Sequence, residues 1–143
     1  MIVVDSNVVA YLYLPCSQTA AAERLLEPDA EWVVPPLWRS EFRNILAGYL
    51  RRGSLTLEQA QEIQQEEEAH LSQYEIGVDS ALVLRLAKNS PCSAYDCEFV
   101  ALARTLGVDL VTHDQKLLAS FPGTARPLPE YSERPLERAK EGQ

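Results

Sequence analysis

The chain has 143 residues, 46% of them apolar, and a formal net charge of −8, which suits one domain with a substantial core. No run approaches the roughly 18 apolar residues of a membrane span, and no secretory signal opens the chain, so we expect a cytoplasmic protein without membrane association. The three cysteines suggest neither a disulfide framework nor a zinc site. The charge disfavours nucleic-acid binding unless divalent cations offset it, since two of them would bring −8 to −4.

The chain opens on a short apolar run, residues 1–5, that is closed by an acid. We expect a buried strand that delivers Asp5 to its carboxyl end, with Ser6 or Asn7 capping a helix over residues 8–13. An open alternative is that Asp5 itself caps this helix. A second helix at residues 17–26 and a second strand at 31–34, ended by two prolines, are predicted to follow.

A long amphipathic helix is predicted over residues 36–52, where one acid lies on the apolar face. Glu41 has apolar residues one turn away on either side, so its carboxylate intrudes on the stripe that packs on the core. Ser40 and Asn44 border Glu41 on the helical wheel and are candidates to support it.

Other charges in this part of the chain are expected to face water. Arg39 and Arg43 lie on the far side of the helix from Glu41, toward solvent or a partner. The next helix, from a cap at Thr56 to about residue 70, carries an acidic run that we interpret as a solvated face: Glu62, Glu66, Glu67 and Glu68.

The last third of the chain predicts a helix, a glycine stop and a strand followed by an acid. The neighbours of Asp96 at i+3, i+4 and i+7 on its helix are all apolar, and a carboxylate there is costly to bury unless it meets a cation. Gly107 is expected to end this helix, residues 108–111 to form a strand, and Asp114 to lie just past it. A short amphipathic helix over residues 78–88 precedes this unit; a helix at 115–120 and an edge strand at 125–128 follow it.

Helices alternating with short apolar strands predict the α/β class, as a three-layer α/β/α sandwich with a mainly parallel central sheet over residues 1–128. Residues 129–143 are expected to form a charged, flexible tail. Asp5 and Asp114 then end strands at one edge of the sheet, and Glu41 and Asp96 begin helices that pack on it. Four carboxylates together repel one another unless cations join them, and oxygen ligands favour one or two Mg²⁺ or Mn²⁺ ions over zinc.

These motifs carry a resemblance to a known family. Ile-Val-Val-Asp5-Ser-Asn, Ser-Glu41, Tyr-Asp96 followed by Val-Ala-Leu-Ala, and Leu-Val-Thr112-His-Asp114 together resemble the PIN-domain nucleases, over residues 1–128. The compact size is similar to that of VapC-type toxins of type II toxin–antitoxin pairs. The resemblance implies that the four acids are the catalytic and metal-binding site. It matches Ser6, Asn7 and Thr112 to polar residues beside that site.

The function implied by the resemblance is metal-dependent hydrolysis of RNA phosphodiester bonds by an endoribonuclease, usually a homodimeric toxin with a cognate antitoxin. Arg104 and Lys116 are the basic residues expected nearest the acidic edge, as candidate RNA contacts, and His113 is expected to be a plain turn residue. One alternative is a PIN-domain RNA-processing nuclease without an antitoxin. Another is an aspartyl phosphotransferase or phosphatase, although that chemistry usually needs a second acid where this chain has Asn7. A non-catalytic binding module is the last alternative.

Overall fold

The computed structural model describes residues 1–26 and 31–128, so the predicted tail at 129–143 lies outside the described residues. Within these ranges four strands form one sheet in the order β2-β1-β3-β4, and every neighbouring pair is parallel. This confirms the α/β class and the parallel sheet, although most strands are shorter than predicted. The strands are β1 (Ile2–Val4), β2 (Trp32–Val33), β3 (Leu110–Val111) and β4 (Ala125–Arg126).

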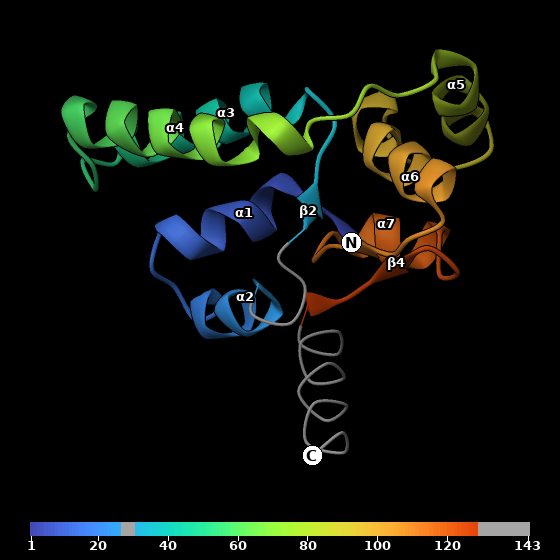
Figure 1. Cartoon of the computed structure of the whole chain (residues 1–143), viewed down its shortest axis with the longest axis horizontal. Coiled ribbons are helices and arrows are strands. Elements are labelled where there is room, and N and C mark those ends of the chain that lie inside the picture. Colours follow the sequence, from blue (N-terminus) through green and yellow to red (C-terminus); the bar gives the residue numbers. More distant parts are fainter. Residues whose placement is uncertain (27–30, 129–143) are drawn as a thin grey trace.

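Helices cover both faces of the sheet and make three layers (Figure 1). One face is packed by α1 (Ser6–Tyr13), α2 (Thr19–Leu26), α3 (Trp38–Arg51) and α4 (Leu57–Leu71), and the 3₁₀ turn η1 (Ser72–Tyr74) follows α4. The other face is packed by α5 (Ser80–Lys88), α6 (Ala94–Leu106) and α7 (Gln115–Ser120). None of the helices in the described ranges combines the length and apolarity that a membrane crossing requires.

Two apolar cores result from the alternation of side chains along each strand. Ile2 and Val4 of β1 belong to the core under α1 to α4, whereas Val3 belongs to the core under α5 to α7. In β3 the same alternation sends Leu110 to one core and Val111 to the other. Because successive side chains of a strand point to opposite faces, a sheet covered on both sides has continuous apolar strands. The polar residues that follow such strands therefore mark the edge of the sheet.

Capping residues fix the ends of α4 and α6, and two of them, Thr56 and Gly107, were predicted from the sequence. Thr56 and Gln59 form a reciprocal capping box at the start of α4. Ser93 caps α6, because its hydroxyl accepts a hydrogen bond from the backbone N–H of Asp96 at 3.1 Å. Gly107 ends α6 in the left-handed conformation, with φ of 69°, which a residue with a Cβ rarely adopts. The cap at Ser93 fixes where α6 begins, and so places Asp96 in the first turn of this helix.

The structure adds ion pairs to one charged side chain and corrects the expectation for another. Arg39 remains partly exposed, at 35% of its side chain, and its guanidinium also pairs with Glu68 at 2.7 Å and with Glu75 at 2.5 Å. Glu67 is only 1% exposed, although it was expected on a solvated face. Its helical spacing explains the burial, because Glu67 lies one turn before the buried Leu71 on the face that packs on the core.

Candidate metal centre

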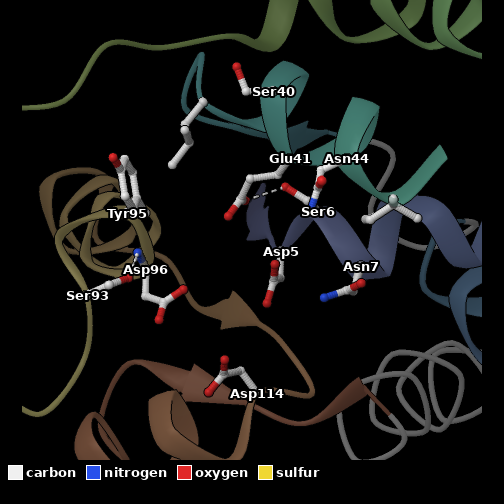
Figure 2. Close-up of a pocket in the computed structure, with 12 residues that line it drawn as sticks. Asp5, Ser6, Asn7, Ser40, Glu41, Asn44, Ser93, Tyr95, Asp96 and Asp114 are labelled. Atoms are coloured by element: carbon white, nitrogen blue, oxygen red, sulfur yellow. Dashed lines mark hydrogen bonds between the residues drawn. The ribbon is translucent and has the colours of Figure 1, made fainter. Parts of the chain in front are cut away.

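The four predicted carboxylates surround one pocket at the carboxyl edge of the sheet. Asp5 directly follows β1 and Asp114 lies just beyond β3, while Glu41 and Asp96 stand in the first turns of α3 and α6. Figure 2 shows their side chains reaching the pocket from different sides. The cavity has a volume of about 510 Å³, within the range of small-ligand sites. Four separate elements therefore bring acids from distant parts of the sequence to one place.

Thr112 joins the two strand ends beneath this pocket. Its hydroxyl donates a hydrogen bond to Oδ2 of Asp5 at 2.7 Å and accepts one from the backbone N–H of Asp114 at 3.0 Å. Thr112 is fully buried, so this bridge is shielded from competing water. The Oδ1 atom of Asp114 in turn accepts a hydrogen bond from the N–H of Leu117, which holds that carboxylate at the start of α7. The bridge therefore fixes the carboxylate of Asp5 relative to the backbone of Asp114.

Glu41 is held by the buried Ser6, whose hydroxyl donates to Oε1 of Glu41 at 2.8 Å. The pKa of Glu41 is raised to about 7, mainly because burial disfavours the charged form. The negative charges of Asp5, Asp96 and Glu98 raise this pKa further, and the hydrogen bond from Ser6 opposes the rise. At neutral pH, Glu41 is therefore poised between its neutral and charged forms.

The pKa of the Asp5 carboxyl is also set by opposing effects. Burial raises its pKa, and the charge of Asp114 adds to the increase, whereas Thr112 and the backbone amides of Ser6 and Asn7 lower it. The helix α1 begins at Ser6 with Asp5 in the N-cap position, so the expectation that Ser6 or Asn7 caps it was wrong and the alternative position for Asp5 holds. The side chain of Asp5 makes no capping hydrogen bond. Its carboxylate is thus available to the pocket.

The carboxylate oxygens around this pocket are chemically suited to a divalent cation. Within residues 1–26 and 31–128, no three acidic, histidine or cysteine side chains converge closely enough to chelate an ion. The carboxylates instead surround a cavity. Mg²⁺ dehydrates reluctantly and commonly binds through one or two carboxylates plus several waters, so a wide all-oxygen ring suits a hydrated ion. A positive charge would also relieve the repulsion that raises the pKa of Asp5 and Glu41.

The supporting residues predicted from the sequence fall into two groups. Those that line the pocket with the acids are Ser6, Asn7, Ser40 and Asn44 (Figure 2). Thr112 lies beneath it, as described above. The hydroxyl of Ser40 also accepts a hydrogen bond from Arg43 at 3.1 Å, which fixes its orientation.

The two candidate RNA contacts do not line the pocket. Arg104 donates to the hydroxyl of Thr124 at 3.3 Å, and its guanidinium lies 5.4 Å from the ring centre of Phe121. It is eight positions along α6 from Asp96, or roughly 12 Å at the helical rise. Lys116 is exposed on α7, outside the residues that line the pocket. The structure therefore does not bring either cation to the carboxylates.

His113 packs more closely than a plain turn residue would. Its ring meets Tyr11 of α1 edge to face, with centroids 5.8 Å apart. Its Nε2 atom is buried without a hydrogen-bond partner among the described residues. The imidazole therefore lies against α1, and it does not line the pocket.

Several residues of the site were missed by the sequence analysis. Leu37, Ile45, Ser93 and Tyr95 line the pocket, and the charge of Glu98 acts on Glu41. Leu37 and Ile45 could have been found, because they flank Glu41 at helical spacing. Glu98 and Tyr95 give no such signal, since their proximity to the site depends on how α6 is oriented against α3.

Comparison with known proteins agrees with this geometry. A family model described as "PIN domain" matches residues 2–121. Ribonuclease VapC3 of Pyrobaculum aerophilum is 30% identical over 131 residues, covering 88% of this chain and 98% of that protein. The solved structure of PAE2754 from Pyrobaculum aerophilum has a TM-score of 0.73 at 22% identity, over 95% of this chain and 89% of that one. FitAcB from Neisseria gonorrhoeae has a TM-score of 0.68 at 15% identity, over 87% and 96%. The sequence match, the parallel sheet and the ring of four acids lead to one conclusion: this chain belongs to the PIN-domain family.

Proposed function

We propose that the chain is a metal-dependent endoribonuclease that hydrolyses RNA phosphodiester bonds, and that it is the toxin of a toxin–antitoxin pair. The observation that carries this proposal is the pocket in which four carboxylates from four elements face one another. Its support is the membership in the PIN-domain family and the similarity to a protein named Ribonuclease VapC3. The place of the acids also supports a binding role, because they lie at the carboxyl edge of a parallel sheet, where α/β folds bind ligands. Surface acids without a binding role would have no reason to gather there.

The residues that would hold one or two Mg²⁺ or Mn²⁺ ions are Asp5, Glu41, Asp96 and Asp114. When bound, such an ion supplies activation of a water molecule and neutralises charge on the leaving oxygen of the phosphodiester. The protein supplies orientation: Thr112 fixes the carboxylate of Asp5, and Ser6 fixes that of Glu41. Preset carboxylates need no reorganisation when a phosphate arrives.

The residues of the pocket also favour hydrolysis over attack by the RNA's own 2′-hydroxyl. Internal attack needs a general acid and base, usually including histidine, and leaves a 2′,3′-cyclic phosphate. Neither of the two histidines lines the pocket. We therefore infer that water attacks phosphorus and that the 3′-oxygen leaves, giving 5′-phosphate and 3′-hydroxyl ends.

The proposed partners are an RNA substrate, a cognate antitoxin and a second copy of the chain. The name of the VapC3 relative supports the antitoxin proposal. An RNA-cleaving toxin acts where cellular RNA is translated, so we place the protein in the cytoplasm. Co-expression with the product of an adjacent small reading frame tests the pairing: a stable complex that suppresses cleavage supports a toxin. The absence of any such partner would favour an RNA-processing nuclease of the same family.

The activity itself is tested with purified protein and a panel of structured RNAs in Mg²⁺, in Mn²⁺ and in chelator. We expect cleavage only with metal. Asp96→Asn should reduce it by orders of magnitude, because this change removes a carboxylate from the pocket. Glu66→Gln is the matched control, since Glu66 is exposed on α4 and is not one of the residues that line the pocket. Cleavage that persists in chelator, or equal losses in both variants, would contradict the assignment of the site.

A further inference from the structure

Tyr95 places an aromatic ring at the carboxylate pocket. It is the second residue of α6, directly before Asp96, and the cap made by Ser93 fixes the backbone at this point. Consecutive Cα atoms lie about 3.8 Å apart, so the ring starts beside a carboxylate of the site. Figure 2 shows the ring at the side of the pocket next to Asp96 and Ser93, with Glu41 and Asp5 across from it.

The ring of Tyr95 is not used by the fold. It is 65% exposed, and it belongs to neither apolar core. Across residues 1–26 and 31–128 its hydroxyl makes no hydrogen bond, and no aromatic or cationic side chain packs on the ring. Packing and helix propensity therefore give no reason for a large aromatic residue here.

Two apolar side chains of α3 also line the pocket. Leu37, at the start of α3, and Ile45, one turn beyond Glu41, line the same pocket as Tyr95. The pocket thus combines acids that suit a hydrated cation with apolar and aromatic side chains that a cation does not need. A nucleotide has both parts, a phosphate for the cation and a flat base for the exposed ring of Tyr95.

We propose that Tyr95 is a stacking platform for the base beside the cleaved phosphate. This inference rests on the proposed nuclease function and names how the same site positions its substrate. A base in an A-form duplex has both faces covered by its neighbours, so stacking on Tyr95 requires an unpaired or displaced nucleotide. Every base has a π-face, so the contact selects for single-stranded structure at the cut and discriminates weakly between bases.

Cleavage kinetics on a single-stranded RNA with one cut site test the role of the ring. Tyr95→Ala should raise KM or lower kcat/KM by ~5- to ~150-fold, the range expected from losing one base–aromatic stack. Tyr95→Phe keeps the ring and should stay close to wild type. Leu84→Ala is the matched control, because Leu84 is 66% exposed on α5 and does not line the pocket. Replacing the base beside the cut with an abasic sugar should slow the wild type by a similar factor and should not slow Tyr95→Ala further.

A binding measurement separates this proposal from the nuclease function. In the Asp114→Asn background with Mg²⁺, a short RNA carrying 2-aminopurine beside the cut should lose fluorescence on binding, and Tyr95→Ala should abolish that loss. If wild type and Tyr95→Ala quench equally, or if the abasic and Tyr95→Ala effects multiply, the stacking role is overturned, whether or not RNA is cut. Quenching without any cleavage by the unmodified protein would support the platform and contradict the nuclease. If light scattering shows that Tyr95→Ala dissociates a dimer that Leu84→Ala keeps, the ring packs on a second copy and the proposal is wrong.

Discussion

Neutralising Glu41 should stabilise the metal-free protein while removing its activity. Glu41→Gln keeps the oxygen that accepts the hydrogen bond from Ser6 and removes a charge that burial, Asp5 and Asp96 all disfavour. The pKa of Glu41 is about 7 in the folded protein against an ordinary 4.5. Such a difference corresponds to about 3 kcal/mol if taken in full, at 1.36 kcal/mol per unit. Because the carboxylate is partly open to water, we discount this to about 1–2 kcal/mol.

The sign of the effect follows from proton binding. Between pH 4.5 and about 7 the folded protein holds a proton on Glu41 that the unfolded chain has released. The contribution of Glu41 to the free energy of unfolding is therefore greatest below pH 4.5, falls as the pH rises through this window, and is level above it. The advantage of Glu41→Gln should be absent near pH 4 and complete at pH 8. For a chain of this length, it corresponds to a melting temperature higher by about 5 °C.

Thermal unfolding in chelator at pH 4 and pH 8 measures this difference. Glu66→Gln is the control for the change in net charge, because it removes an equal charge from an exposed position. Adding Mg²⁺ should raise the melting temperature of the wild type more than that of Glu41→Gln, since a bound ion stabilises the folded state by mass action. The reasoning is refuted if Glu41→Gln melts at or below the wild type at pH 8, or if Glu66→Gln gains as much.

Three further predictions concern residues around the site. Thr112→Val should lower cleavage strongly and destabilise the fold by about 1–3 kcal/mol, because it leaves the Asp5 carboxylate and the N–H of Asp114 without their shared buried partner; full activity would contradict the bridge. Glu67→Gln should raise the melting temperature at pH 8 but not at pH 4, because burial raises the pKa of Glu67, and cleavage should be unchanged; a drop in cleavage would mean that this residue serves the site. His113→Ala should leave 5′-phosphate and 3′-hydroxyl ends with at most a modest loss of rate, and end analysis that finds a 2′,3′-cyclic phosphate would refute hydrolysis by water.

The parts of the site that the sequence predicts are those placed by a single element. Asp5 and Asp114 follow buried strands, so a parallel sheet brings them to one edge regardless of the conformation of the connecting loops. Asp96 and Glu41 interrupt apolar helix faces, and this local pattern marks them without knowledge of the tertiary structure. Thr56, which begins α4, and Gly107, which ends α6, were predicted for the same reason, whereas the cap of α6 at Ser93 was not.

Features that depend on two elements were not predictable in the same way. The ion pairs of Arg39 join α3 to α4 and to the segment after η1, and only the packing of these elements reveals them. The same holds for Tyr95, whose position at the pocket depends on the approach of α6 to α3. Glu67 is a different case. It interrupts an apolar face just as Asp96 does, so the argument that identified Asp96 also applied to it, and the neighbouring exposed glutamates concealed this signal.

The strand order has a consequence for how the protein is made. β1 lies at the centre of the sheet and pairs on one side with β3, whose residues are more than a hundred positions later in the chain. During synthesis the ribosome therefore releases Asp5 long before Thr112 and Asp114 exist to meet it. A nascent chain that stops before β3 has an open central strand and only part of the acid ring. Long-range pairing of this kind is formed late, so the growing chain cannot assemble the ring of four acids until the ribosome has made β3 and Asp114.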